Sequence, residues 1–217
     1  MNLDKYQTTI NTFGKLAEQY QEKYLENDVY QETYDDLLGL IDPEQIEVLD
    51  IGCGPGSVSL HLAKNRPNLK FTGFDPAEEM VVLARTNLPD ANLFVLDARD
   101  LGTGVANLAP QSFDIMVCGF CIPYLDNEDV AVLIRQCAEL SRGNGLFYLS
   151  FMADDLEKSR MFSNDRGDEV FIHYHDADQV RGKLTACGFE VIYEKQMKLD
   201  QDNADTDIFF IARRSQV

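Results

Sequence analysis

The chain has 217 residues, 45% of them hydrophobic, and a formal net charge of −18. That hydrophobic fraction allows a sizeable core and excludes a disordered chain. Because nucleic-acid and anionic-membrane binders usually present a basic surface, we expect neither as a partner. No apolar run approaches the roughly 20 residues of a membrane helix. Residues 1–10 lack the apolar stretch of a secretory signal, so the expected location is cytoplasmic.

The five cysteines, without a secretory signal, predict reduced thiols. Cys118 and Cys121 have C-x-x-C spacing, but no second pair of Cys or His stands at a spacing suited to zinc. The motif also ends an apolar, strand-like run, whereas a redox motif usually opens a helix. We therefore interpret the spacing as coincidence and predict no metal site.

The first elements along the chain are helical. Residues 12–41 carry apolar side chains at helical spacing and predict two amphipathic helices, separated at Asn27 and Asp28. Pro43 ends this unit.

Short apolar runs then alternate with helical patterns. The expected strands are residues 46–51, 69–74, 92–96, 113–118 and 146–152, and the expected helices between them are residues 57–65, 76–86 and 127–140. Such alternation predicts a mainly parallel sheet with helices on both faces. A turn is expected at residues 142–145.

The C-terminal part departs from this alternation. A helix at residues 177–187 is followed by two successive strands, at 189–199 and 207–213. Two strands without a helix between them predict a hairpin, so the last strand should run antiparallel to its neighbours.

The first predicted strand leads into a glycine-rich turn, Gly52-Cys53-Gly54-Pro55-Gly56. Glycine lets a backbone approach a ligand closely, and open parallel sheets bind ligands beyond the carboxyl ends of their strands. A dinucleotide site would favour G-x-G-x-x-G with a pyrophosphate over the helix N-terminus. Here the spacing is G-x-G-x-G and proline removes one N–H donor, which favours a cofactor without a pyrophosphate.

Acidic residues end the next two predicted strands. Asp75 follows the second strand, where a carboxylate can accept hydrogen bonds from both hydroxyls of a ribose. Asp97 and Ala98 follow the third, where an acid and a backbone N–H can bind an adenine edge. Three such features at consecutive strand ends predict one nucleoside site.

Residues 48–152 resemble the core of the class I methyltransferases that use S-adenosylmethionine (SAM). The resemblance rests on the glycine-rich turn, on Asp75, on Asp97-Ala98 and on the fourth-strand segment at residues 113–119. It implies an α/β fold with a seven-stranded Rossmann-like sheet of order 3-2-1-4-5-7-6, strand 7 antiparallel, and helices on both faces. We expect a single domain over residues 1–217, with residues 1–43 as a helical cap.

The resemblance also implies how SAM is held. Gly52 and Gly54 would contact its methionine end, Pro76 and Met80 would flank the adenine, and Cys118 and Gly119 would lie under the sulfonium. A Phe-x-x-x-Ala-x-x-Tyr pattern in the N-terminal helix adds Tyr20 and Tyr24 as candidate lid residues. The full predicted cofactor set is Tyr20, Tyr24, Asp50, Gly52, Cys53, Gly54, Gly56, Asp75, Pro76, Met80, Asp97, Ala98, Cys118 and Gly119.

The stretch at residues 153–175 is too long for an ordinary connection and predicts a lid over the acceptor. It ends in His173, Tyr174 and His175, of which at least one should face the sulfonium; a neutral His can accept a proton. With Tyr124, which follows the fourth strand, these are the candidate catalytic residues.

The expected function is methyl transfer from SAM to an O, N or C nucleophile of a small molecule. Two alternatives stay open at this point: a regulatory protein that binds SAM without turnover, and a nicotinamide-dependent oxidoreductase. The sequence leaves the acceptor and the oligomeric state undetermined.

Overall fold

A seven-stranded sheet forms the centre of the protein in a computed structural model, which describes residues 4–25, 29–103, 107–198 and 206–216. The strand order is β3-β2-β1-β4-β5-β9-β8, and β9 runs antiparallel to both of its neighbours. With the separate pair β6–β7 left out of the numbering, this is the expected order 3-2-1-4-5-7-6. The strands are β1 Glu47–Ile51, β2 Lys70–Asp75, β3 Asn92–Val95, β4 Phe113–Gly119, β5 Ser141–Ala153, β6 Arg160–Ser163, β7 Glu169–Ile172, β8 Phe189–Met197 and β9 Thr206–Arg214.

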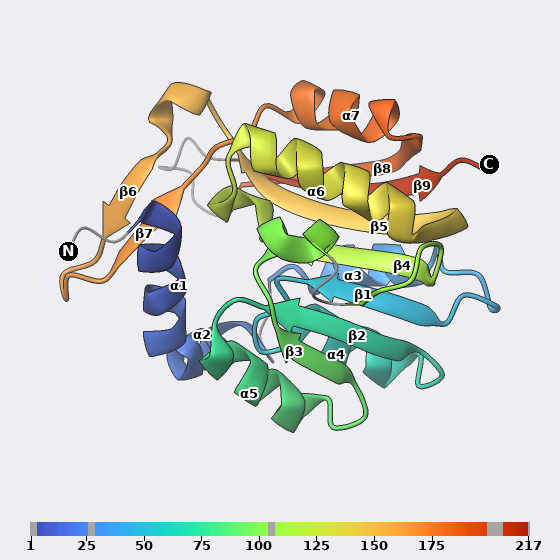
Figure 1. Cartoon of the computed structure of the whole chain (residues 1–217), viewed down its shortest axis with the longest axis horizontal. Coiled ribbons are helices and arrows are strands. Elements are labelled where there is room, and N and C mark those ends of the chain that lie inside the picture. Colours follow the sequence, from blue (N-terminus) through green and yellow to red (C-terminus); the bar gives the residue numbers. More distant parts are fainter. Residues whose placement is uncertain (1–3, 26–28, 104–106, 199–205, 217) are drawn as a thin grey trace.

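Helices cover both faces of this sheet (Figure 1). They are α1 Lys5–Lys15, α2 Ala17–Tyr24, α3 Gln31–Leu38, α4 Ser57–Asn65, α5 Glu78–Asn87, α6 Asn127–Leu140 and α7 Ala177–Ala186. The apolar sides of α6 and α7 pack on one face and those of α3 and α4 on the other, and α5 packs beside α4. Across the described ranges, no helix is both long and apolar enough to span a membrane.

The strand β1 and its parallel neighbours fix the position of the glycine-rich turn. Val48, Leu49 and Ile51 are fully buried, and β1 pairs in parallel with β2 on one side and β4 on the other. The carboxyl ends of these strands therefore meet at one edge of the sheet. In Figure 1, α1 lies at this edge, with β7 beside it.

The N-terminal cap differs from its prediction. It contains three helices, and the first begins at Lys5 instead of residue 12. The backbone leaves the helical conformation at Leu16, with φ −102° and ψ 11°, so one predicted helix is divided into α1 and α2. The expected break at Asn27 and Asp28 lies outside the described residues.

Two further segments also differ. The expected turn at residues 142–145 belongs to β5, because Ser141 already pairs with Phe113 before a shift in register, and Asn144 takes φ 65° within it. Residues 153–175, expected as a long connection that acts as a lid, contain a short 3-10 helix at Leu156–Lys158 and the antiparallel hairpin β6–β7.

Candidate functional site

The glycine-rich turn after β1 adopts a backbone that favours glycine. Gly52, Gly54 and Gly56 have φ of 63°, 53° and 87°. A Cβ on Gly52 would lie 2.8 Å from Cys121 Sγ, whereas a Cβ on Gly54 would meet nothing closer than the Tyr20 ring at 3.9 Å. Gly54 therefore presents open backbone to the space above the sheet.

Gly56 has a packing role. It caps α4 in the left-handed conformation, and a Cβ there would approach Leu88 of α5 to 2.9 Å. Gly56 was predicted as a cofactor residue, but it lines neither of the cavities described below. Any effect on the cofactor would therefore act through the position of α4.

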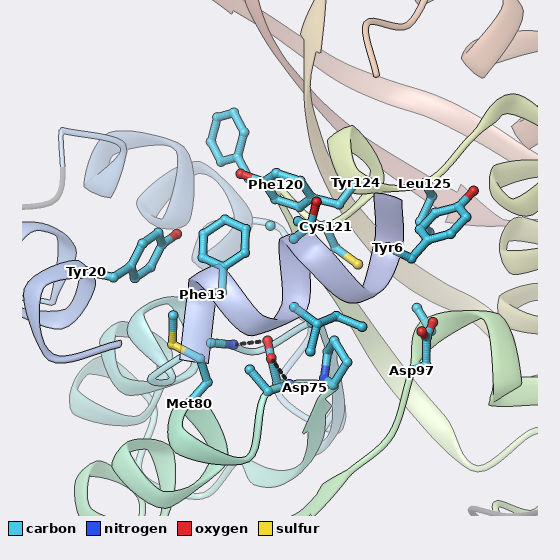
Figure 2. A pocket seen from close by; sticks show the side chains of 18 residues that line it. Tyr6, Phe13, Tyr20, Asp75, Met80, Asp97, Phe120, Cys121, Tyr124 and Leu125 are labelled. Carbon is cyan, nitrogen blue, oxygen red and sulfur yellow. Dashed lines mark hydrogen bonds between the residues drawn. The ribbon is translucent and has the colours of Figure 1, made fainter. Parts of the chain in front are cut away.

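Asp75 is held in one orientation by the backbone around it. Its two carboxylate oxygens accept hydrogen bonds from the N–H groups of Gly54, at 3.0 Å, and Ala77, at 2.9 Å (Figure 2). Burial raises the pKa of Asp75 to about 6, although these two bonds oppose the shift. Each oxygen keeps a further lone pair, so the carboxylate can still accept hydroxyl groups of a ligand.

Asp50 is a second buried carboxylate close to the turn. It accepts a hydrogen bond from Ser59 Oγ at 2.5 Å, and burial raises its pKa to about 7. The nearby charge of Asp75 raises it further, while the Ser59 bond opposes the shift.

Two cavities open above the carboxyl ends of the strands and meet at the turn. The residues that line both are Tyr20, Gly52, Gly54, Gly119, Phe120 and Tyr124.

The first cavity takes in the acidic strand ends. Predicted cofactor residues that line it, besides the shared ones, are Asp75, Pro76, Met80, Asp97 and Ala98. The second takes in the predicted residues Tyr24, Asp50 and Cys53. Cys118 lines neither, because its side chain is fully buried in the core beneath Gly119.

The side chain of Asp97 is already paired in this structure. Arg99 Nε lies 3.1 Å from each of its oxygens and Arg99 Nη2 lies 2.7 Å from one of them. The guanidinium of Arg99 in turn lies 3.9 Å from the centroid of the Tyr6 ring. Asp97 is therefore anchored at the wall of the first cavity next to the N-terminal helix.

One face of α1 covers the first cavity, and only its last residue, Phe13, belongs to the pattern from which a lid was predicted. Tyr6, Thr9, Ile10 and Phe13 all line the cavity, and Figure 2 shows Tyr6 and Phe13 at two places along the helix. These positions have the i, i+3, i+4, i+7 spacing of a helix face. This spacing is visible in the sequence, but the helix was predicted to begin at residue 12, which left Tyr6, Thr9 and Ile10 outside it.

The second cavity has an aromatic lining, of which Tyr20, Tyr24 and Tyr124 were predicted as site residues and the other rings were not. Besides Tyr24, it includes Tyr30, Tyr34 and Phe120, together with Met152 at the end of β5. Tyr20 and Tyr24, like Tyr30 and Tyr34, are four residues apart, which places each pair on one helix face.

Tyr124 lies where the two cavities meet. Its ring packs edge-on against Phe13, with the centroids 4.8 Å apart. Burial raises the pKa of its hydroxyl well above the ordinary value, so the group is a neutral hydrogen-bonding partner at pH 7.

The expectation for His173, Tyr174 and His175 is not met, since none of the three lines either cavity. Tyr174 is buried near Phe162, and His175 is buried with its Nε2 2.8 Å from the Ile122 carbonyl oxygen. These two side chains pack the connection against the sheet edge.

His173 comes nearest to the site, because its ring stacks on Tyr6 with centroids 6.5 Å apart. His173 thus packs against a residue that lines the first cavity, without lining the cavity itself. Burial and the nearby charge of Lys5 lower its pKa to about 4, so the ring is neutral at pH 7.

Residues 48–145 match the family model described as a methyltransferase domain. A trans-aconitate 2-methyltransferase of Escherichia coli strain 55989 is 38% identical over 161 residues, 73% of this chain and 58% of that protein. A release factor glutamine methyltransferase of Streptococcus pneumoniae is 38% identical over 100 residues, 44% of this chain and 34% of that protein. The chain thus spans less than two thirds of these relatives.

Solved structures share the fold over a larger part of the chain. A magnesium protoporphyrin IX methyltransferase from Synechocystis with bound SAM has a TM-score of 0.71 at 19% identity, covering 99% of both chains. A Methanosarcina mazei protein described as a SAM-dependent methyltransferase also has a TM-score of 0.71, at 20% identity over 84% of this chain and 98% of that one. At such identities the likeness concerns the fold.

Proposed function

The chain belongs to the class I methyltransferases that use S-adenosylmethionine, and on that premise we propose that it methylates a small-molecule acceptor. The observation that carries the proposal is the pair of cavities meeting at the Gly52–Gly54 turn. One cavity offers carboxylates to a nucleoside, and the other leaves room for an acceptor. The second cavity takes in predicted cofactor residues at the turn and extends beyond them to Tyr30, Tyr34 and Met152, where an acceptor would enter.

The residues of the first cavity fit the cofactor. The open backbone at Gly54 is accessible to its methionine end, and the Asp75 carboxylate has lone pairs left for the ribose hydroxyls. Asp97 and Ala98 would hold the adenine edge, with Met80 against the ring. Bound SAM supplies a methyl group activated by its positively charged sulfur, and the acceptor's lone pair displaces the sulfur from that methyl carbon.

The contribution of the protein to this reaction is alignment and exclusion of water. Tyr124, at the junction of the cavities, would orient the acceptor, because its un-ionised hydroxyl can both donate and accept. We assign no proton transfer to His173 or His175.

We further propose that residues 153–175 act with α1 as one lid. The backbone N–H of Phe171 in β7 donates to Thr9 Oγ1 at 3.0 Å, and Thr12 Oγ1 donates to the Glu169 carbonyl at 2.7 Å. Lys15 pairs with Asp168 just before β7. The hairpin would therefore hold α1 over the first cavity and act on the site through it.

Calorimetric titration with SAM, with S-adenosylhomocysteine and with NADH tests the proposal. We expect saturable binding of both sulfur compounds. Release of S-adenosylhomocysteine, with a methylated product detected by mass spectrometry in a metabolite extract, would then establish turnover. Saturable NADH binding without SAM binding would refute the proposal.

A further inference from the structure

The ring of Tyr6 connects the helix α1 to the strand ends that line the first cavity. Tyr6 lies in the first turn of α1, and it lines this cavity together with Asp97, which follows β3 (Figure 2). Arg99 contacts both, because its guanidinium pairs with Asp97 and its Cζ lies 3.9 Å from the centroid of the Tyr6 ring. A guanidinium over an aromatic face is a favourable cation–π contact. The helix is thus attached, through Arg99, to the carboxylate at the end of β3.

The hydroxyl group of the same ring is bound by the start of α6. Tyr6 Oη lies 2.7 Å from a carboxylate oxygen of Asp129 and 3.0 Å from one of Asp126, and its single hydrogen can be donated to either. Asp126 has a fixed position, because its other carboxylate oxygen accepts the N–H groups of Glu128 and Asp129 as the N-cap of α6. Tyr6 is therefore held both by its face and by its hydroxyl group.

Arg99 is itself fixed by Asp97. Its Nε lies 3.1 Å from each carboxylate oxygen, its Nη2 lies 2.7 Å from one of them, and its backbone N–H donates to the same side chain at 2.9 Å. The hydrogen bonds to Asp97, and the charges of Asp97 and Asp129, raise the pKa of Arg99, although burial opposes the shift. The guanidinium is therefore charged and held in place, so a change in the position of Asp97 reaches the Tyr6 ring through it.

The apolar side chains on this face of α1 leave part of their surface to the cavity. Tyr6, Ile10 and Phe13 are each partly exposed, and they line the cavity together with Met80 and Ala98. A ring system placed among them would bury apolar surface on α1 and would stabilise the helix where it lies. A ligand in this cavity therefore adds to the contacts that hold α1 in place.

On the proposed function, which gives the first cavity to adenosine, we propose that Arg99 and Tyr6 are positioning residues that couple adenine binding to closure of α1. Adenine bound at Asp97 fixes the carboxylate and with it the guanidinium, which holds the Tyr6 ring and the helix over the ligand. Coupling between two such events is reciprocal. Weakening the contact between Tyr6 and Arg99 must therefore weaken the binding of adenosine, and bound adenosine must make α1 open less often.

A double-mutant cycle on the affinity for S-adenosylhomocysteine measures this coupling without turnover. Arg99→Met removes the guanidinium, and Tyr6→Leu removes the ring. We expect each change to weaken binding by about fivefold, the scale of one partly buried cation–π contact. The double variant should bind about threefold more tightly than the product of the two single effects predicts, as residues in direct contact do. Arg135→Met removes the same charge from an exposed position of α6 and should bind like the parent.

Tyr6→Phe separates the contribution of the ring from that of the hydroxyl group. It loses the hydrogen bonds to Asp126 and Asp129 but keeps the aromatic face next to Arg99. Arg99→Met should therefore weaken binding as much in a Tyr6→Phe protein as in the parent, and clearly less in a Tyr6→Leu protein.

Hydrogen exchange of the α1 backbone gives a second readout, one that a general loss of stability would not change in a ligand-dependent way. Saturating S-adenosylhomocysteine should slow exchange at residues 5–15 strongly in the parent and severalfold less in Arg99→Met. Exchange in α7, residues 177–186, should respond equally in both proteins, because α7 does not line the cavity.

Additive effects of the two substitutions would overturn the inference, and so would equal slowing of α1 in the parent and in Arg99→Met. The exchange measurement decides the matter alone if Tyr6→Leu does not fold, because it uses only the parent and the Arg99 variant. Both outcomes leave the proposed methyl transfer intact, because binding of S-adenosylhomocysteine to the parent is measured first. Absence of that binding would refute the proposed function instead.

Discussion

The two ends of the site are built in different ways. At the adenosine end, Asp75 ends β2 and Asp97 follows the edge strand β3, and the parallel pairing of these strands brings both residues to one edge of the sheet. At the acceptor end, the rings come from α2, from α3 and from the turn after β4, which meet only in the folded chain. On the proposed function, recognition of the cofactor is local to strand ends, whereas recognition of the acceptor depends on how the N-terminal helices are packed.

Gly52→Ala should give the largest effect, since it disrupts the turn that both ends share. The new Cβ would lie 2.8 Å from Cys121 Sγ on a backbone with φ +63°. We expect SAM affinity to fall by about 3 kcal/mol, the combined scale of overpacking and of a left-handed non-glycine residue. Calorimetry measures the loss of SAM affinity, and thermal melting measures the loss of stability.

Gly167→Ala is the matched control for that change. Gly167 has φ +78°, but a Cβ there would meet nothing within 4 Å. It should cost some stability and leave SAM affinity unchanged. A folded Gly52→Ala protein with the affinity of the parent would show that the turn does not contact the cofactor.

Asp75→Ala tests the adenosine end alone. Loss of the carboxylate should weaken SAM binding by about 1.5–3 kcal/mol, the scale for hydrogen bonds to a charged group. Asp90→Ala removes the same charge from an exposed position and serves as the control. If the two variants bind SAM equally well, the ribose assignment is wrong.

The pH dependence of SAM binding sharpens the comparison further. Burial raises the pKa of Asp75 to about 6, so this carboxyl group is mostly protonated below that pH. If the ribose needs the carboxylate, affinity should rise by up to about tenfold per pH unit towards pH 6 and level off above it. Dissociation constants between pH 5 and 8 should show this slope in the parent and not in Asp75→Asn.

The stability of the ligand-free protein should change in the opposite direction. Asp50 and Asp75 have raised pKa values of about 7 and 6, so between pH 4 and 7 the folded state binds more protons than the unfolded chain. Their contribution to the free energy of unfolding therefore decreases as the pH rises through this window. Urea titrations of Asp50→Asn should show a smaller decrease than those of the parent.

The smallest effect is expected for the lid. Thr9→Val removes the acceptor for the Phe171 N–H and should raise the dissociation rate of SAM by a fewfold, because a typical hydrogen bond contributes about 1 kcal/mol. Thr8→Val on the same helix is the control, as Thr8 is partly exposed and lines neither cavity. If stopped-flow measurements give equal dissociation rates for Thr9→Val and Thr8→Val, the hairpin does not affect the release of SAM.

The position of the turn could be predicted because it depends on short-range patterns, whereas the order of the sheet was implied by the resemblance to the class I methyltransferases. The expected bounds of α4 and α6 agree with the structure, residues 57–65 and 127–140. The start of α1 was missed because Tyr6, Thr9 and Ile10 precede the apolar pattern from which the helix was predicted. Helix ends are set by such weak local signals.

The amino-acid sequence alone, through its resemblance to the class I methyltransferases, was sufficient to predict the SAM cofactor and the strand-end residues proposed to bind it, because glycines and acids recur after consecutive strands. It could not place His173, Tyr174 and His175, whose alternation suggested a face towards the acceptor. In the folded chain none of the three lines either cavity, since His173 packs against Tyr6, Tyr174 lies near Phe162, and His175 Nε2 lies 2.8 Å from the Ile122 carbonyl oxygen. It also could not bring Tyr30 to Phe120, 90 residues apart, because contacts between distant segments form only when the helices pack on the sheet.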